Sequence, residues 1–248
     1  MGILNGQVIL VTGAANRVGK GIALQLAKAG STVALHYFRS IEEIQVTAKE
    51  IESIGGKVAY FQADIANLEE VEHMHQAIQS TLGNVTGVVN NAGLANLKSL
   101  FDYKPNEWQR ELDVCLNGVI HLAYTFIPSM KINNNGKFIT IIGDSARTGD
   151  RKLIISAAAR SGVISFMKSL AQEVGRHHIQ CNTISLGLLD QGDIHLDERA
   201  YKQLLKNYPL QRFGNVNDVT GIIQFLLSNE ANWITGQVFS VNGGYTML

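Results

Sequence analysis

Two glycines in the stretch VILVTGAANRVGKGIALQLAKAG, Gly13 and Gly19, have the type and spacing needed to bind a phosphate group. The stretch predicts a strand, a glycine-containing turn and a helix. Glycine lets the backbone approach a pyrophosphate closely, and a helix N-terminus offers free N–H groups and a partial positive charge. The spacing is Gly-x5-Gly rather than Gly-x-Gly-x-x-Gly. Taken alone, the turn is therefore equally explained by a tight strand-to-helix corner.

A second candidate is the Arg39–Ser40 pair, which follows the apolar run at 32–37. A site for NAD(H) places a carboxylate after this strand to bind the ribose 2′-OH, but the strand here ends in HYF, without an acidic residue. Arg39 and Ser40 could instead bind a 2′-phosphate, because the guanidinium fork suits phosphate. The pair favours NADP(H) over NAD(H). The alternative is that Ser40 only caps the next helix, with Glu43 as capping-box partner, and that Arg39 is solvated.

These residues are positioned by short apolar runs that alternate with helical stretches. The strand-like runs lie at 7–12, 32–37, 57–63, 87–90, 137–143, 179–185 and 237–241. The helical stretches lie at about 18–29, 41–54, 67–82, 106–128, 154–174 and 215–228. Runs that are apolar on both faces and separated by helices are typical of a buried parallel sheet. The sequence predicts one α/β domain over residues 1–248, with a seven-stranded parallel sheet and helices on both faces.

The composition limits the partners. The formal net charge is zero and no long basic block occurs, which argues against nucleic acid or an anionic membrane surface as primary partner. Cys115 and Cys181 lie in apolar runs, as expected for buried thiols of a reducing compartment. We find no signal-peptide pattern, no apolar run of membrane length and no cluster with metal-ligand spacing. The expected location is the cytoplasm, and no metal is expected.

Five motifs follow one another along the chain: TGAANRVG (12–19), ADI (63–65), NNAG (90–93), LQRFGNVNDV (210–219) and ITGQVFSVNGG (234–244). Together they resemble the short-chain dehydrogenase/reductase family over essentially the whole chain. The resemblance implies a doubly wound, Rossmann-type fold and a homotetramer or homodimer. It also implies a cofactor site in which Gly13 and Gly19 line the pyrophosphate, Asp64 and Ile65 contact adenine, and the NNAG motif lies along the ribose. The complete set of cofactor residues implied is Gly13, Arg17, Val18, Gly19, Arg39, Ser40, Asp64, Ile65, Asn90, Ala92, Gly93, Arg160 and Gly187.

Arg17 stands where the family's glycine turn usually has its middle glycine. Within the family this substitution resembles the pteridine reductase branch, as does the Arg-Ser pair in LHYFRS (35–40). The branch implies a carbonyl or pterin-like C=N substrate.

The four catalytic positions of the family pattern are all replaced. The pattern has a tyrosine as proton donor, a lysine four residues later, a serine thirteen residues before the tyrosine, and an asparagine on an earlier helix. In the register set by FMKSLAQE (166–173), these positions are Ser156, Arg160, Gly143 and Cys115. A different gap in the preceding loop would bring Asp144 or Ser145 to the serine position, which would restore one member of four.

The substitutes are poorly suited to proton transfer. Ser156 and Arg160 share a helix face, but serine is a far weaker acid than tyrosine, and arginine stays charged. We therefore expect activity by the Tyr–Lys route to be absent or very weak. The rival interpretation is a non-catalytic NADP(H) sensor or an inactive subunit of a hetero-oligomer.

The nicotinamide side also departs from the family, with Leu186-Gly187 in place of Pro-Gly and Gln191 in place of a threonine. Replacement acids could come from Asp144 or from segment 190–212, which covers the substrate pocket in relatives. The candidates in that segment are His195, Tyr201 and Tyr208. Packing or solvent exposure is the alternative explanation for each.

Overall fold

The computed structural model describes residues 2–192, 194 and 197–248, which form a seven-stranded parallel sheet in the order β3-β2-β1-β4-β5-β6-β7. The strands are β1 (Val8–Val11), β2 (Thr32–Tyr37), β3 (Val58–Gln62), β4 (Gly87–Asn90), β5 (Gly136–Gly143), β6 (Ile179–Leu186) and β7 (Val238–Val241). All seven predicted strands are confirmed, and with them the doubly wound α/β fold.

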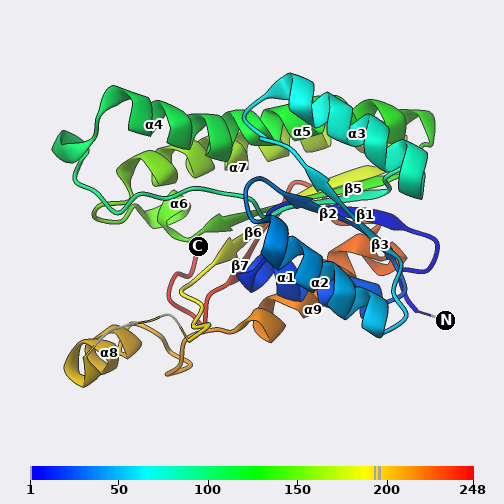
Figure 1. Cartoon of the computed structure of the whole chain (residues 1–248). Helices are drawn as coiled ribbons and strands as arrows, with labels where there is room; N and C mark the ends of the chain where they lie inside the picture. The colour runs from blue at the N-terminus through cyan, green and yellow to red at the C-terminus, as the bar shows by residue number, and fades with distance from the viewer. Residues whose placement is uncertain (1, 193, 195–196) are drawn as a thin grey trace.

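Helices cover both faces of the sheet (Figure 1). One layer contains α1 (Arg17–Lys28), α2 (Ile41–Ser53) and α9 (Val216–Leu227). The other contains α3 (Leu68–Leu82), α4 (Pro105–Leu112), α5 (Gly118–Ile132) and α7 (Ile154–Val174). The short helices are α6 (Ser145–Thr148) and α8 (Glu198–Leu205), and α8 lies apart from both layers in Figure 1.

The chain reverses its strand order at β1. Val11 on this strand is opposite Leu35 of β2 on one side, and its neighbour on the other side is Val89 of β4. In doubly wound sheets, ligands bind beyond the carboxyl ends of the strands at this reversal. The topology therefore places a binding cleft between the segment after β1 and the segment after β4.

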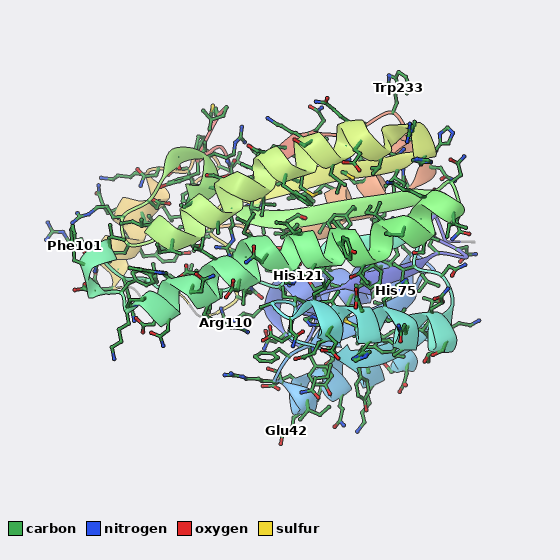
Figure 2. The ribbon with its side chains drawn as sticks, turned by 90° about the horizontal axis from the view of Figure 1, so that it is seen from above. Glu42, His75, Phe101, Arg110, His121 and Trp233 are labelled. Atoms are coloured by element: carbon green, nitrogen blue, oxygen red, sulfur yellow. The ribbon has the colours of Figure 1, made fainter. Side chains whose placement is uncertain are left out.

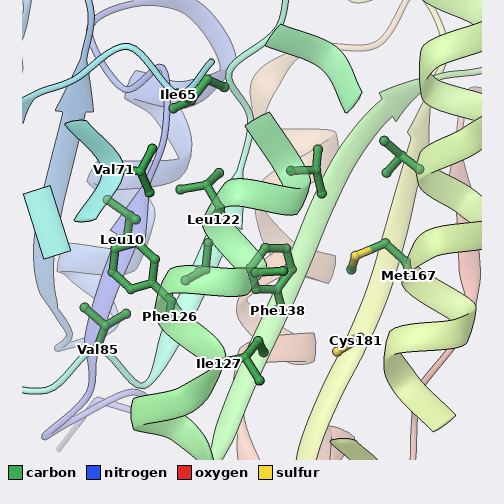
Figure 3. Packing of buried hydrophobic residues seen from close by; sticks show 14 of the residues in the cluster. Leu10, Ile65, Val71, Val85, Leu122, Phe126, Ile127, Phe138, Met167 and Cys181 are labelled. Carbon is green, nitrogen blue, oxygen red and sulfur yellow. The ribbon is translucent and has the colours of Figure 1, made fainter. Parts of the chain in front are cut away.

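Alternation along the strands divides the core in two. Leu10 packs in the cluster under α3, α5 and α7, whereas Ile9 and Val11 pack in the cluster under α1, α2 and α9. Figure 3 shows Leu10 in the first cluster with Phe126 and Phe138, which are fully buried. This two-sided burial is the reason why the strands read as continuous apolar runs in the sequence.

Three details differ from the sequence-based expectations. The helix predicted over 106–128 is interrupted by a π-helical turn, Asp113–Asn117, between α4 and α5. Ser40 is the N-cap residue of α2, but its side chain makes no capping hydrogen bond, so the predicted capping box is wrong. The helix α8 was not expected; it begins after Asp197, whose side chain accepts a hydrogen bond from the Ala200 N–H.

Candidate functional site

A cavity of about 640 Å³ opens at the strand-order reversal. Nine predicted cofactor residues line it: Gly13, Arg17, Val18, Gly19, Arg39, Asp64, Ile65, Ala92 and Gly93. It is also lined by Asn16, His36, Phe38, Asn91, Leu94, Arg110, Val114 and Gln191. Four predicted residues are not among its lining: Ser40, Asn90, Arg160 and Gly187.

The glycine turn after β1 is closely packed. Gly13 has a φ of +61°, which favours glycine, and a Cβ on Gly19 would lie 2.1 Å from the Gly13 carbonyl oxygen. Arg17, the first residue of α1, has a φ of +50° in the same left-handed region. This backbone conformation explains why glycine suits position 17 and why arginine there is strained.

His36 supports this turn, a role that the sequence did not suggest. Its Nδ1 accepts a hydrogen bond from the Gly13 N–H at 3.1 Å, and its Nε2 lies 2.9 Å from the Ala63 carbonyl oxygen. The ring is therefore the neutral Nε2–H tautomer, which donates to Ala63. Burial lowers the pKa of His36 to about 4, which keeps the ring uncharged at neutral pH.

The adenine end implied by the family resemblance contains an ion pair that the sequence did not reveal. Arg110 of α4 donates to both carboxylate oxygens of Asp64, at 2.8 and 3.0 Å. Burial would raise the pKa of Asp64, but the Arg110 hydrogen bonds and charge, with a bond from the Ala66 N–H, leave it below its ordinary value. The guanidiniums of Arg39 and Arg110 lie 4.8 and 5.4 Å from the centre of the Phe38 ring. Figure 2 labels Arg110 at the end of its helix.

The NNAG motif holds the glycine turn through the side chain of its second asparagine and through its backbone N–H groups. Asn90 is buried and its Oδ1 accepts from the Thr12 hydroxyl at 2.8 Å, so its side chain supports the neighbouring strand. The same hydroxyl accepts from the N–H groups of Asn91 and Ala92. The side chain of Asn91 donates to the carbonyls of Thr12 and Gly13. The motif therefore fixes the β4 end against the glycine turn.

Two of the four catalytic positions lie one turn apart on α7. Ser156 is 1% exposed, and its Oγ is without a hydrogen-bond partner among the described residues. Arg160 extends to the segment after β4, where its Nη2 lies 2.6 Å from the position of a Cβ on Gly93. The structure thus brings Arg160 against Gly93, a residue that lines the cavity.

The other two positions carry no acid that can titrate near neutral pH. Cys115 lies in the π-helical turn, donates from Sγ to the Leu94 carbonyl at 3.0 Å and accepts from its N–H. Burial raises the pKa of this thiol, although the charge of Arg160 opposes the effect. Gly143, the last residue of β5, has no side chain.

Two of the replacement acids considered from the sequence, Asp144 and Tyr208, have their polar groups engaged elsewhere. Buried Asp144 accepts from Ser185 Oγ at 2.5 Å and from Asn242 Nδ2 at 2.6 Å, so both oxygens are used in fixing β6 and the segment after β7. Tyr208 is also buried; its hydroxyl accepts from the Leu188 N–H, and burial raises its pKa. The Tyr201 ring packs edge-on against Phe213. His195 lies outside the described residues.

Gly187 donates its N–H to the Val241 carbonyl at the end of the sheet.

Among residues 2–192, 194 and 197–248, we find no group of three or more side chains suited to a metal ion. No helix of this part has the length and apolar character needed to cross a bilayer.

The fold and the glycine-turn cleft define an α/β protein of the dinucleotide-binding class, and comparison with known proteins identifies the family. A family model described as enoyl-(acyl carrier protein) reductase matches residues 13–246. The 3-oxoacyl-(acyl-carrier-protein) reductase FabG of Staphylococcus aureus (strain Mu50) is 35% identical over 240 residues, covering 96% of this chain and 97% of the relative. FabG of Buchnera aphidicola (subsp. Baizongia pistaciae) is 32% identical over 242 residues, covering 97% and 98%.

A solved structure supports the same family. A protein from Sinorhizobium meliloti 1021, described as a short-chain alcohol dehydrogenase, superposes with a TM-score of 0.93 at 30% identity and covers 98% of this chain and 97% of its own. The chain belongs to the short-chain dehydrogenase/reductase family of oxidoreductases. The matched relatives do not test the resemblance to the pteridine reductase branch, which stays a prediction.

Proposed function

We propose that this protein is an NADP(H)-binding short-chain dehydrogenase/reductase whose activity by the usual Tyr–Lys mechanism is absent or very weak. The single domain is proposed to span residues 1–248, with 190–212 covering the substrate pocket. The observation that carries the proposal is the contrast between the cavity and α7. The cavity has the lining of a nucleotide site, whereas Ser156 and Arg160 stand at the positions of the proton donor and its lysine.

The cavity suits a phosphorylated dinucleotide. Among the described residues, its charged lining consists of Arg17, Arg39, Arg110 and a single carboxylate, Asp64. The close Gly13–Gly19 packing leaves backbone rather than side chain at the start of α1, where a pyrophosphate is favoured. The guanidinium of Arg39 would bind the 2′-phosphate. Ser40 is the N-cap residue of α2, and the partial positive charge at this helix N-terminus would favour the phosphate as well.

When bound, reduced cofactor supplies a hydride to a carbonyl or pterin-like C=N group, and the protein must supply the proton. The oxidoreductases that resemble this chain act on a 3-oxoacyl carbonyl, according to their names, so such thioesters belong among the substrates to test. The hydroxyl of Ser156 is too weakly acidic for the role, and Arg160 replaces the lysine of the family pattern. Loss of a general acid costs about 10²–10⁴ in rate.

A thermal-shift titration combined with a turnover assay tests the proposal. NADPH should raise Tm more than NADH, and the difference should vanish in Arg39→Ala. Oxidation of NADPH should be slow or undetectable with ketones, quinones, dihydropterins and 3-oxoacyl thioesters. Equal shifts by the two cofactors would refute the 2′-phosphate assignment. Rapid turnover that survives Ser156→Ala would show that another acid acts.

A second candidate function is a non-catalytic NADP(H) sensor or an inactive subunit beside an active relative. The replacement of the family's tyrosine and lysine by Ser156 and Arg160 favours it, since the usual proton donor is missing at these positions. Binding of NADPH without turnover of any substrate in the panel would support this function over the first.

We further propose a homotetramer or homodimer. A groove of about 730 Å³ runs along α3, α5 and α7, and Tyr124 on α5 is 67% exposed beside it. Large exposed apolar surfaces usually mark interfaces. Light scattering should give a mass of two or four chains, reduced to one or two by Tyr124→Glu.

A further inference from the structure

We propose that Arg110 is a specificity-determining residue that selects 2′-phosphorylated adenine nucleotides by neutralising the charge of Asp64. The inference rests on the proposed NADP(H) site and adds to it a residue from α4, a helix that the cofactor motifs do not include.

The first step is the geometry of the pair. The two N–H···O bonds between Arg110 and Asp64 form a bidentate fork, with the side chains 37% and 17% exposed. This arrangement holds the guanidinium in a fixed orientation as well as compensating the carboxylate. Both residues line the nucleotide cavity, so the pair is part of the binding surface.

The second step is the charge of the cavity. Asp64 is the only carboxylate among the described lining residues, and it lies after β3, next to the strand that leads to Arg39. A 2′-phosphate carries close to two negative charges at pH 7, and an uncompensated carboxylate in the same cavity would repel it. Arg110 removes this repulsion and leaves the charge of Arg39 for the ligand.

The third step is the position of Phe38. Its ring is near both guanidiniums, from Arg39 on the β2–α2 loop and from Arg110 on α4. Cation–π contacts of this kind favour a defined arrangement of the three side chains. Arg110 therefore connects α4 to the loop that is proposed to bind the 2′-phosphate.

The Arg110–Asp64 ion pair contributes little to the stability of the folded protein, as is general for partly exposed ion pairs. The segment after β3 has other attachments: the Asp64 N–H donates to Glu70, and the Ile65 carbonyl lies 2.9 Å from His121 Nδ1. Variants at Arg110 should therefore fold, and a change in ligand preference should be measurable.

The test uses two ligands that differ only in the 2′-phosphate: adenosine 2′,5′-bisphosphate and adenosine 5′-monophosphate. Calorimetry on the full chain gives the Kd of each, and the ratio of the second Kd to the first is the 2′-phosphate preference. Arg110→Ala should lower this preference about tenfold, less at high salt, because Asp64 becomes uncompensated. Arg110→Lys should keep most of it, and Asp64→Asn added to Arg110→Ala should restore it.

Arg176→Ala is the matched control, because it removes one exposed guanidinium that does not line the cavity; it should leave the preference unchanged. An unchanged preference in Arg110→Ala, or a loss that Asp64→Asn does not restore, would overturn the inference while leaving the proposed NADP(H) site intact. Wild-type protein that binds neither nucleotide, or both equally well, would instead refute the proposed site, and the inference with it.

Discussion

The guanidinium of Arg160 lies directly against the backbone of Gly93, with Nη2 2.6 Å from the position that a Cβ would occupy. This contact connects α7 to the segment after β4, two elements that meet only through the fold. Because the group that meets Gly93 is the end of a flexible side chain, it can move away from an added methyl group. At Gly19 the nearest atom is the backbone carbonyl oxygen of Gly13, which cannot move away in the same way.

We therefore expect Gly19→Ala and Gly93→Ala to behave differently. At Gly19 the new methyl would lie 2.1 Å from the Gly13 carbonyl oxygen, so the turn must distort, and we expect a loss of about 3 kcal/mol in unfolding free energy together with loss of nucleotide binding. At Gly93 we expect a change of about 1 kcal/mol or less, since Arg160 can move away. Urea unfolding measures both. Equal losses would show that Arg160 is held rigidly.

Removing the Ser156 hydroxyl should stabilise the protein. A buried polar group without a partner costs about 1–3 kcal/mol, and the Ser156 Oγ has none among the residues that the structure describes. Ser156→Ala should raise the unfolding free energy by about 1 kcal/mol. The matched control is Ser185→Ala, which removes a buried hydroxyl that donates to Asp144 and should lower it. A loss of stability in Ser156→Ala would indicate a partner for this hydroxyl.

Acid should destabilise the protein through His36 before most carboxylates are protonated. Burial lowers the pKa of this ring to about 4 in the folded protein, whereas the unfolded chain binds the proton near pH 6.5. The unfolded state therefore holds more protons between these values, and stability falls as the pH drops from about 6.5 to about 4, by about 3 kcal/mol in total.

The measurement is the unfolding free energy from pH 7.5 to 4.5. His36→Gln should flatten the profile over this window, although it lowers stability at pH 7. His73→Gln, at an exposed position, should leave the slope unchanged. A slope that persists in His36→Gln would assign the titration to another group.

Both thiols should be unreactive in the folded protein. Burial raises the pKa of Cys115, and raises that of Cys181 to about 12, so neither is a thiolate at pH 7.5. The thiolate is the reactive form. Titration with a thiol reagent should therefore detect no rapidly reacting cysteine in the native protein and two after unfolding in guanidinium. Fast labelling of Cys115, abolished in Cys115→Ser, would contradict its burial.

The sequence by itself determined the architecture and the position of the cleft at the strand-order reversal. Apolar runs separated by helices fix a parallel sheet, because a strand buried on both faces must be apolar on both. The glycine turn and the motifs that follow identified nine residues that line the cavity. Such signals are local: the period of the pattern and the conformation of a turn are recorded in neighbouring residues.

The tertiary structure alone decided which side chains meet. Arg110 and Asp64 are 46 residues apart, and nothing in the spacing of either predicts their bidentate bond. The same holds for His36 with Gly13, and for Asp144, whose partners in β6 and after β7 make it a fixed structural residue. Long-range contacts depend on strand register, on helix rotation and on the direction of each side chain. These are set by packing of the whole domain rather than by any short segment.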